Sequence, residues 1–511
     1  MTRPSLKHLV VVAGFGMSHI RPCLLFCIRL AAKFPNVFIS VYVPGPTAPQ
    51  CEAYLDAYHK GAHERVRVIP SIVDIPIVGP LDLMISMERG FGPWITQQLA
   101  SSSVEIDGLV VEAPSYIIED HINGGIAVAN KQYHQLPIAA WWVSTAASFI
   151  AHFGNAERGG GWRVVTAVRD AMNKQEPGKE KTFEELFTQE RTDRIVCVPG
   201  LPPHYEHEQM PQNQPALLPI IAQLHGRWMA VKDQPELVVF NSMYEMESIA
   251  AEAVVNALSK PLKSCCTGLN ADFPASVTPQ LDIHTADPVL AFMNRAYTEF
   301  GAHSVVYIAF GHFFFPPAES IDHLKIVMEE ILALGLRLVF SIKAEYTKTA
   351  GLEGYFDNLI ESGNAIFPEW TRQLEVLEHP SLHYFLTHGG WNSITEAIVR
   401  HVPMIVWPMG GDQPTNAMQI ARQLDCGFEL VQVRTGPARS VAFGVNGDIP
   451  IIGSDEAVRA EVQRVLKMSK DKRGTQQRLN IRALGKLARD SLKPGGSADI
   501  ALEQFGKAVG L

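Results

Sequence analysis

Residues 383–408 have the sequence HYFLTHGGWNSITEAIVRHVPMIVWP, and this stretch decides the fold. It begins with the apolar run His383–Thr387, which has the length of a buried strand. His388, Gly389 and Gly390 then make a tight loop, and ITEAIVR after them has helical spacing. The apolar segment MIVWP follows as a second strand. This order of strand, glycine loop, helix and strand predicts one unit of a parallel sheet.

The same alternation occurs throughout the chain. Near its start, the apolar runs Leu9–Val12 and Val37–Val43 flank a loop with Gly14 and Gly16 and a segment expected to be a helix opened by Pro22. Further strands are expected at Asp107–Val111, Leu136–Trp142, Leu237–Phe240 and Ser304–Phe310. An apolar face from Ile321 predicts a helix, and LRLVFSI after Gly335 predicts the next strand.

A change of composition divides the chain. Residues 261–288 are rich in Pro, Ser, Asn, Asp and Thr, which is typical of an interdomain linker. We expect an N-terminal domain at 1–265, a C-terminal domain at 285–490 and a C-terminal helix at 491–511 that packs back on the first domain. The predicted class is α/β, with two Rossmann-like doubly wound domains that face each other across a cleft.

Composition excludes several classes of protein. Of 511 residues, 47% are hydrophobic and 19% charged, and the net charge is −9, which argues against a nucleic-acid binder. The seven cysteines are odd in number and include no CxxC pair, so we expect neither a disulfide framework nor a zinc site. No apolar stretch approaches the ~20 residues that span a bilayer. A cytoplasmic protein without a membrane span is therefore expected.

The loop of residues 388–390 has the chemistry of a phosphate site. A glycine loop between strand and helix directs backbone N–H groups and the positive helix end at one point. Trp370 offers a flat face for a base, and the side chains of Asp412 and Gln413 suit sugar hydroxyls. Two structural alternatives remain open: Ser393 and Glu396 match a capping box, and Trp370 could serve core or surface packing.

The segment from Trp370 to Gln413 closely resembles the nucleotide-sugar signature box of UDP-dependent glycosyltransferases with the GT-B fold, best known from plant natural-product enzymes. The matching residues are Trp370, Gln373, Leu377, His379, Pro380, His388, Gly390, Trp391, Asn392, Ser393, Glu396, Asp412, Gln413 and Asn416. The resemblance implies that Trp370 stacks on uracil and that Gln373 and Glu396 hold the ribose. It also implies diphosphate contacts by His388, Asn392 and Ser393, sugar contacts by Trp391, Asp412 and Gln413, and glucose as the donor sugar.

Other segments carry the resemblance further. SVVYIAFG (Ser304–Gly311) looks like the first strand and loop of the family's C-terminal domain, which makes Gly311 a donor-site residue. His312 replaces the serine usual at the next position, so that phosphate contact is not carried over. VVFNSMYEMES (Val238–Ser248) and CVPGLPP (Cys197–Pro203) resemble two further family segments.

A histidine after the first strand is the candidate general base. His19 lies where the carboxyl ends of the strands line the cleft, and a histidine can take a proton near neutral pH. The resembled enzymes use a histidine in a GHxxP context here, together with an aspartate after the strand near residue 110. Glu112 is the expected orienting carboxylate in this chain, with Asp107, Glu119 and Asp120 as competitors.

These residues together predict an inverting transfer of a sugar from a UDP-sugar donor to a small apolar acceptor with a hydroxyl group. Aromatic residues of the first half are candidates for the acceptor pocket, namely Phe91, Trp94 and Trp142. No cofactor and no metal are expected, because the sequence has no DxD motif. A UDP-sugar-binding protein without catalysis and a nucleotide-sugar epimerase on the same fold are the alternatives.

Overall fold

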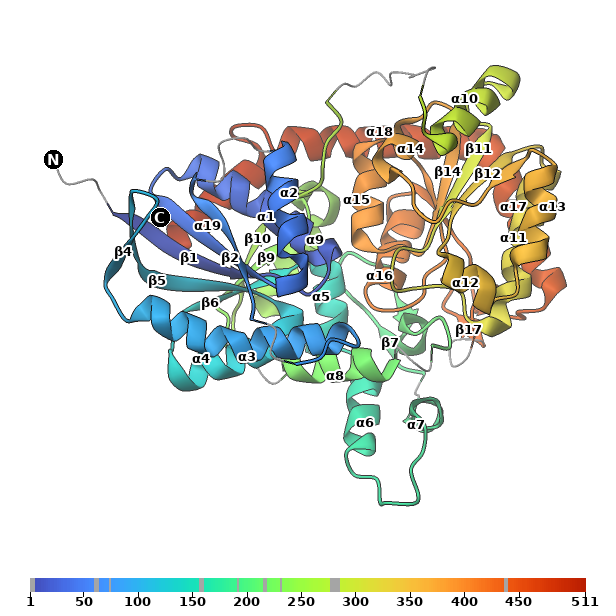
Figure 1. Cartoon of the computed structure of the whole chain (residues 1–511). Coiled ribbons are helices and arrows are strands. Elements are labelled where there is room, and N and C mark those ends of the chain that lie inside the picture. The colour runs from blue at the N-terminus through green and yellow to red at the C-terminus, as the bar shows by residue number, and fades with distance from the viewer. Residues whose placement is uncertain are drawn as a thin grey trace. The chain divides into compact units, whose positions relative to one another are not determined.

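The computed structural model describes residues 5–58, 64–72, 75–155, 160–190, 193–214, 218–229, 232–275, 285–435 and 440–511. The chain forms two compact units (Figure 1). Unit 1 comprises Met1–Arg169, Leu217–Ala271 and Asp490–Leu511; unit 2 comprises Asp170–Ala216 and Asp272–Arg489. This division differs from the expected one at residues 170–216, which group with the second unit. Within the expected linker, residues 276–284 lie outside the described residues.

Unit 1 is built on a mainly parallel sheet with the strand order β10-β9-β6-β5-β1-β2-β3. The strands are β1 (Leu6–Val12), β2 (Val37–Val43), β3 (Val66–Pro70), β5 (Leu109–Asp120), β6 (Ile138–Trp142), β9 (Leu237–Phe240) and β10 (Lys263–Cys266), and β4 (Ser103–Ile106) pairs antiparallel with β5. Helices α3 (Pro80–Leu99) and α4 (Gly124–Tyr133) cover one face, and α1 (Met17–Lys33) covers the other (Figure 1).

The helix after β1 begins earlier than the sequence suggests. It was expected to open at Pro22, but α1 begins at Met17, because Gly16 already accepts hydrogen bonds from the amides of His19 and Ile20 at 2.8 and 3.0 Å. Pro22 therefore lies inside the helix, and His19 lies in its first turn. A side chain in that turn has a fixed direction, whereas one in a free loop does not.

The strand expected at Asp107–Val111 is really a turn followed by a much longer strand. Asp107 and Gly108 both have positive φ, 47° and 76°, and form the turn between β4 and β5. Such Asp-Gly pairs are typical of tight hairpins. β5 then continues past Pro114, with register shifts against β1, and ends at Asp120. The carboxyl end of this strand is consequently at Asp120.

The core of unit 1 combines β1, β2 and α1 with the last helix of the chain, α19 (Ser497–Ala508). Phe505 of α19 is fully buried and packs edge-on against Phe26 of α1, with 5.4 Å between ring centroids. Leu502 and Val509 join the same apolar cluster. The extreme C-terminal segment thus belongs to the core of the unit that also contains the first strand.

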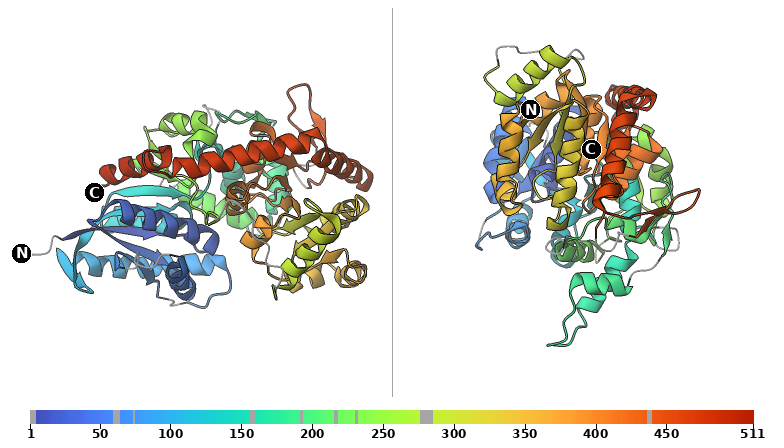
Figure 2. Two further views of the ribbon diagram at one scale, coloured as in Figure 1. Left: turned by 90° about the horizontal axis from the view of Figure 1, so that it is seen from above. Right: turned by 90° about the vertical axis from the view of Figure 1, so that its right-hand side faces the viewer.

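Unit 2 is built on a second parallel sheet with the order β13-β12-β11-β14-β15-β16. Its strands are β11 (Val305–Ala309), β12 (Arg337–Ser341), β13 (Ala365–Ile366), β14 (Leu382–Thr387), β15 (Met404–Val406) and β16 (Gly427–Glu429). Helices α11 (Ile321–Ala333) and α17 (Asp455–Lys470) lie side by side against it (Figure 2). Two parallel sheets with covering helices confirm the predicted α/β class.

Candidate functional site

The first candidate centre lies in unit 1, where the first turn of α1 meets the end of β5. Nδ1 of His19 lies 2.8 Å from Oδ2 of Asp120. The Asp120 side chain is fully buried, while 23% of the His19 side chain is exposed. A buried carboxylate on Nδ1 holds the ring and the tautomer, and it stabilises the imidazolium when Nε2 takes a proton. The arrangement is that of a general base with its orienting acid.

Glu112 does not take part in this pair, so the carboxylate preferred from the sequence is wrong. Glu112 instead accepts a hydrogen bond from the hydroxyl of Ser5 at 2.5 Å. It lies near the start of β5, opposite Ser103 of β4, whereas catalytic side chains of such sheets extend from the carboxyl ends. Asp120, one of the named competitors, occupies that end.

A second histidine, absent from the sequence prediction, touches the same carboxylate. Nδ1 of His121 lies 3.2 Å from Oδ1 of Asp120, in an orientation outside hydrogen-bond geometry, so the contact is electrostatic. Burial alone would raise the pKa of Asp120, but His19 and His121 hold it well below its usual range. Asp120 is therefore ionised throughout the neutral and mildly acidic range. His121 follows Asp120 directly in the sequence. It could have been predicted as a site residue only if the end of β5 had been known.

The aromatic acceptor candidates fall into two groups. Phe91 and Trp94 of α3 both pack on Tyr42 at the end of β2, with centroid distances of 5.3 and 5.2 Å. Trp142 belongs to another group and lies 4.1 Å from the ring of His121. Its indole N–H donates to Ser148 at 2.9 Å. Trp142 is thus the candidate that the structure brings next to the His19–Asp120 pair.

The second candidate centre lies in unit 2, at the carboxyl end of β14. Burial lowers the pKa of His388 to about 4, so the imidazole is neutral at pH 7. Glycines surround the ring: a Cβ on Gly390 would lie 2.4 Å from its Nε2, and one on Gly311 would lie 3.0 Å from its Cε1. Gly311 also has φ of +74°, which disfavours other residues. The loops that contain Gly311 and Gly390 therefore both leave room for the His388 ring only because these residues are glycines.

The helix after this loop does not use the capping box that Ser393 and Glu396 could form. α15 (Trp391–Val399) has Gly390 as its N-cap, with no side-chain cap bond. Ser393 consequently lies in the first helical turn beside Asn392, at the positive end of the helix. Trp391 is buried. The capping-box alternative is therefore wrong for Ser393 and Glu396.

Glu396 is engaged with the other expected ribose residue. Nε2 of Gln373 donates to Oε2 of Glu396 at 2.7 Å. Oε1 of Gln373 accepts from the hydroxyl of Tyr307 at 3.1 Å, and this hydroxyl also lies 2.7 Å from Oγ1 of Thr371. Tyr307 was not predicted, since it lies in the middle of β11 and resembles an ordinary core residue. Its hydroxyl orients Gln373, which in turn binds Glu396.

Trp370 lies on the surface of unit 2, with 69% of its surface exposed. The core-packing alternative is therefore wrong for this residue. The flat face of the indole is therefore open to solvent.

The expected sugar residues lie in a loop joined to the glycine loop. Asn416 donates from Nδ2 to Oδ2 of Asp412 at 2.9 Å and to the carbonyl of Gly389 at 3.0 Å. Oε1 of Gln413 accepts from the amides of Met409 and Gly410 at 2.8 and 3.2 Å. The structure thus brings Asp412 and Gln413 close to the backbone of the phosphate-type loop.

His312, at the family's serine position, lies beside a basic residue. The Lys343 ammonium donates to the carbonyl of His312 at 3.2 Å. Burial, followed by the charge of Lys343, lowers the pKa of His312. The loop after β11 therefore offers a neutral imidazole and a nearby ammonium where the resembled enzymes have a hydroxyl.

Within the described ranges, no group of three or more His, Cys, Asp or Glu side chains could hold a metal ion. The described helices also include none with the length and apolarity needed to cross a membrane.

Known proteins resemble this chain in sequence and fold. Residues 220–435 match the family described as "UDP-glucoronosyl and UDP-glucosyl transferase". The chain is 23% identical to UDP-glycosyltransferase eriJ of Hericium erinaceus over 84% of each chain. It is 32% identical to UDP-glycosyltransferase 74C1 of Arabidopsis thaliana over 40% of each chain.

Solved structures share the fold along the whole length. A transferase from Siraitia grosvenorii, solved in complex with UDP, has a TM-score of 0.69 and 19% identity, with 98% of this chain and 99% of that one covered. Medicago truncatula UGT71G1, solved with UDP-glucose, has a TM-score of 0.67 and 16% identity, with 99% of this chain and 98% of that one covered. The family match over residues 220–435, the fungal relative aligned over 84% of each chain and the shared fold together support the assignment of this chain as a UDP-glycosyltransferase with the GT-B fold.

Proposed function

We propose that this UDP-glycosyltransferase moves glucose from UDP-glucose to a hydroxyl group of a small lipophilic acceptor, with inversion at the anomeric carbon. The observation that carries the proposal is the His19–Asp120 pair, with 2.8 Å between Nδ1 and Oδ2 and a fully buried carboxylate. Such a pair is the minimum needed to activate a hydroxyl for direct attack.

In the proposed reaction, Nε2 of His19 takes the acceptor hydroxyl proton while the acceptor oxygen bonds to the anomeric carbon. The bond from that carbon to the β-phosphate oxygen breaks, and UDP leaves with the electron pair. Attack opposite to the leaving group inverts the configuration. Asp120 stabilises the imidazolium, and general-base catalysis of this kind contributes roughly 10²–10⁴-fold to the rate.

The donor half of the proposal depends on unit 2. The first turn of α15 and the glycine loop with His388 suit a diphosphate, because the N–H groups and the helix dipole stabilise negative charge there. The same groups would stabilise the charge that develops on leaving UDP. Trp370 is proposed to stack on uracil, and Gln373 with Glu396 to bind the ribose. Related structures that contain UDP or UDP-glucose support this donor class.

Sugar and acceptor are the finer parts of the proposal. Glucose is favoured by Gln413 at the end of the signature box, and a lipophilic acceptor by Trp142 beside His121. The departure of Glu112 from the family aspartate is the feature that would favour a UDP-sugar-binding protein without catalysis. Asp120 removes that reason, and no residue of the described chain favours an epimerase.

The decisive experiment is a mass-spectrometric screen of phenols and alcohols with UDP-glucose, UDP-galactose and UDP-glucuronate. We expect UDP and a β-glycoside to appear together, only when an acceptor is present. His19→Ala should abolish the product while calorimetry still detects UDP binding. A glycoside of unchanged yield from His19→Ala, or the absence of UDP binding by the folded natural chain, would refute the proposal.

A further inference from the structure

One segment of unit 2 is distant in sequence from the residues that form the sheet of this unit. Residues 204–214, called here the buttress segment, include β8 (His204–Tyr205) and η5 (Glu206–Gln209) and belong to the same compact unit as residues 272–489. Two of its main-chain contacts are with residue 435: the amide of Thr435 donates to the carbonyl of Pro211 at 3.0 Å, and the amide of Asn213 donates to Oγ1 of Thr435 at 2.8 Å.

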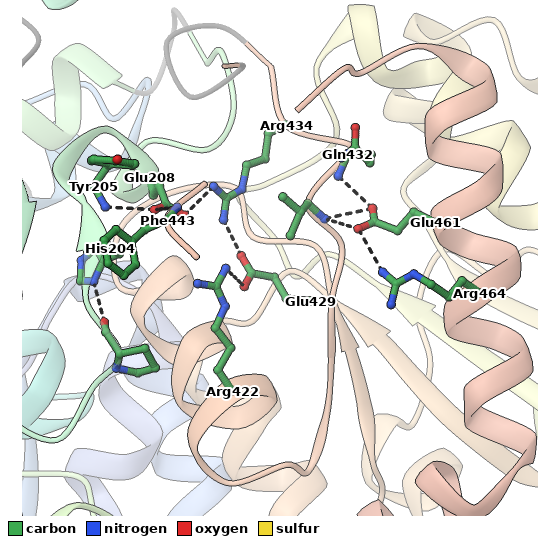
Figure 3. A network of polar contacts seen from close by, with 12 residues as sticks. His204, Tyr205, Glu208, Arg422, Glu429, Gln432, Arg434, Phe443, Glu461 and Arg464 are labelled. Atoms are coloured by element: carbon green, nitrogen blue, oxygen red, sulfur yellow. Dashed lines mark hydrogen bonds and ion pairs between the residues drawn. The ribbon is translucent and has the colours of Figure 1, made fainter. Parts of the chain in front are cut away.

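A buried ionic network locks the buttress segment in place (Figure 3). Arg434 is fully buried, and its guanidinium donates to Glu208 at 2.9 Å and to Glu429 at 2.7 Å. Glu429 also accepts from Arg422 at 2.9 Å. Burial would raise the pKa of Glu208, yet Arg434 keeps that pKa below its ordinary value, so the pair is ionised. Two carboxylates and two guanidiniums balance in charge, which makes the buried network tolerable.

The other carboxylate oxygen of Glu208 extends this lock to the backbone. Oε1 accepts from the amide of Phe443 at 2.8 Å and from the amide of Tyr205 at 3.0 Å. Glu208 therefore fixes the buttress segment at its own first turn and at a chain segment more than 200 residues later. A segment held in this way can act as a rigid support for its neighbours.

Its neighbour is the loop that carries the sugar candidates. Gln212 is fully buried, and its Nε2 donates to the carbonyl of Pro408 at 3.3 Å while its Oε1 accepts from Thr435 at 3.1 Å. With the amide turned over, Oε1 accepts from the indole of Trp407 at 3.2 Å and Nε2 donates to Thr435 at 3.1 Å. In both orientations Gln212 joins Thr435 to the start of the loop of residues 407–413.

The bonds that fix the place of this loop in the unit include the one from the amide of Trp407 to the carbonyl of Thr387 at 2.8 Å, and the loop also has internal bonds that fix its shape. The internal bonds run from the amides of Met409 and Gly410 to Oε1 of Gln413, where α16 (Gln413–Met418) begins. The buttress segment also reaches the loop after β11, which contains Gly311 and His312, because Nε2 of Gln214 donates to the carbonyl of Phe315 at 3.2 Å. The 407–413 loop and the loop after β11 therefore both contact the buttress segment.

We propose that Gln212 is a positioning residue for donor-sugar recognition, which sets the 407–413 loop against the buttress segment so that Asp412 and Gln413 meet the sugar of a UDP-sugar. This inference rests on the proposed function. Gln212 does not contact the donor; it acts through the loop. Its loss therefore affects the hexose part of the ligand and spares the nucleotide part, which Trp370, Gln373 and Glu396 bind.

The test compares calorimetric binding of UDP and of UDP-glucose to the whole chain, and needs no acceptor. Gln212→Met keeps the volume of the side chain and removes its hydrogen bonds. We expect the Kd of UDP-glucose to rise about five- to tenfold, as for the loss of one or two hydrogen bonds, with the Kd of UDP changed less than twofold. Thr435→Val should have the same effect from the other side of the contact, and Thr435→Ser should restore binding.

Gln209→Met is the matched control. Gln209 is also a buried glutamine of the buttress segment, but its amide contacts His204 at 3.0 Å and not the 407–413 loop. It should leave both Kd values unchanged. Equal weakening of UDP and UDP-glucose by Gln212→Met, no weakening at all, or the same effect from Gln209→Met would overturn the inference. If the natural chain bound no UDP, the proposed function itself would fail, which is a distinct result.

Discussion

Asp120 and His19 are 101 residues apart in the chain, yet Oδ2 of the one lies 2.8 Å from Nδ1 of the other. The contact exists because β5 runs twelve residues to a buried end, and α1 begins early enough to place His19 in its first turn. The contact between His19 and Asp120 therefore depends on where helix α1 begins and where strand β5 ends.

Asp120→Asn tests this pair directly. The variant keeps the shape of the side chain but loses the charge that stabilises the imidazolium, so we expect kcat/KM for transfer to fall by about 10²–10⁴-fold. Calorimetric Kd values for UDP should stay within twofold of the natural chain. Glu112→Gln is the control, and its transfer rate should be unchanged. A large loss with Glu112→Gln and none with Asp120→Asn would make Glu112 the orienting carboxylate after all.

Gly311→Ala should weaken UDP binding. An alanine there must adopt φ near +74° and place its Cβ 3.0 Å from the His388 ring, so His388 has to move. We expect a roughly tenfold higher Kd for UDP, equivalent to about 1.4 kcal/mol. Gly335→Ala is a matched control, since Gly335 has φ of +76° and a Cβ at this position would meet nothing within 4 Å. It should cost stability through the same backbone strain of about 1–2 kcal/mol and leave UDP binding intact.

Trp370→Ala should reduce affinity without unfolding the protein. The indole is 69% exposed, so its removal leaves no cavity. Stacking of a base on an aromatic ring is worth about 1–3 kcal/mol, which predicts a five- to hundredfold higher Kd for UDP at an unchanged Tm. Trp370→Phe should recover part of the affinity. Val445→Ala, at another exposed apolar residue of unit 2, should change neither quantity.

Acidification should destabilise unit 2 in part through His388. Burial lowers the pKa of this residue from 6.5 to about 4, so the unfolded chain binds a proton more readily than the folded chain between these values. Stability therefore rises with pH across this window and is lost as the pH falls from 6.5 towards 4. Protonation of His388 lowers the free energy of unfolding by about 2 kcal/mol between pH 7 and pH 5.

The measurement is denaturant unfolding at pH 7 and pH 5, compared for the natural chain and His388→Gln. The variant should lose less stability on acidification. Other buried histidines, including His8, His225 and His379, have pKa values lowered to about 4 in the same way, so some acid sensitivity must remain. An identical loss in both proteins would show that His388 is not a neutral buried group.

Removal of divalent metal should leave transfer unaffected. The proposed mechanism assigns the charge of leaving UDP to the start of α15 and the loop around His388, and the sequence has no DxD motif. Transfer rates with and without EDTA should agree within error. A loss of rate that Mg²⁺ or Mn²⁺ restores would contradict this mechanism.

The amino-acid sequence by itself determined the alternation of strands and helices, the two parallel sheets and the donor signature from Trp370 to Gln413. These are local features: hydrophobic period, glycine loops and a contiguous motif depend on residues close together in the chain. For the same reason β2 and β9 were predicted residue for residue.

Only the tertiary structure decided which carboxylate meets His19, that residues 204–214 support the loop with Asp412 and Gln413, and that Phe505 completes the core beside the first strand. The sequence favoured Glu112 and left Asp120 as a competitor, and the extent of β5 decides between the two carboxylates. Such contacts join residues that lie far apart in the chain, and their formation depends on the summed burial and pairing of whole elements. No local sequence pattern predicts these contacts, because the same short segment is compatible with many different tertiary neighbours.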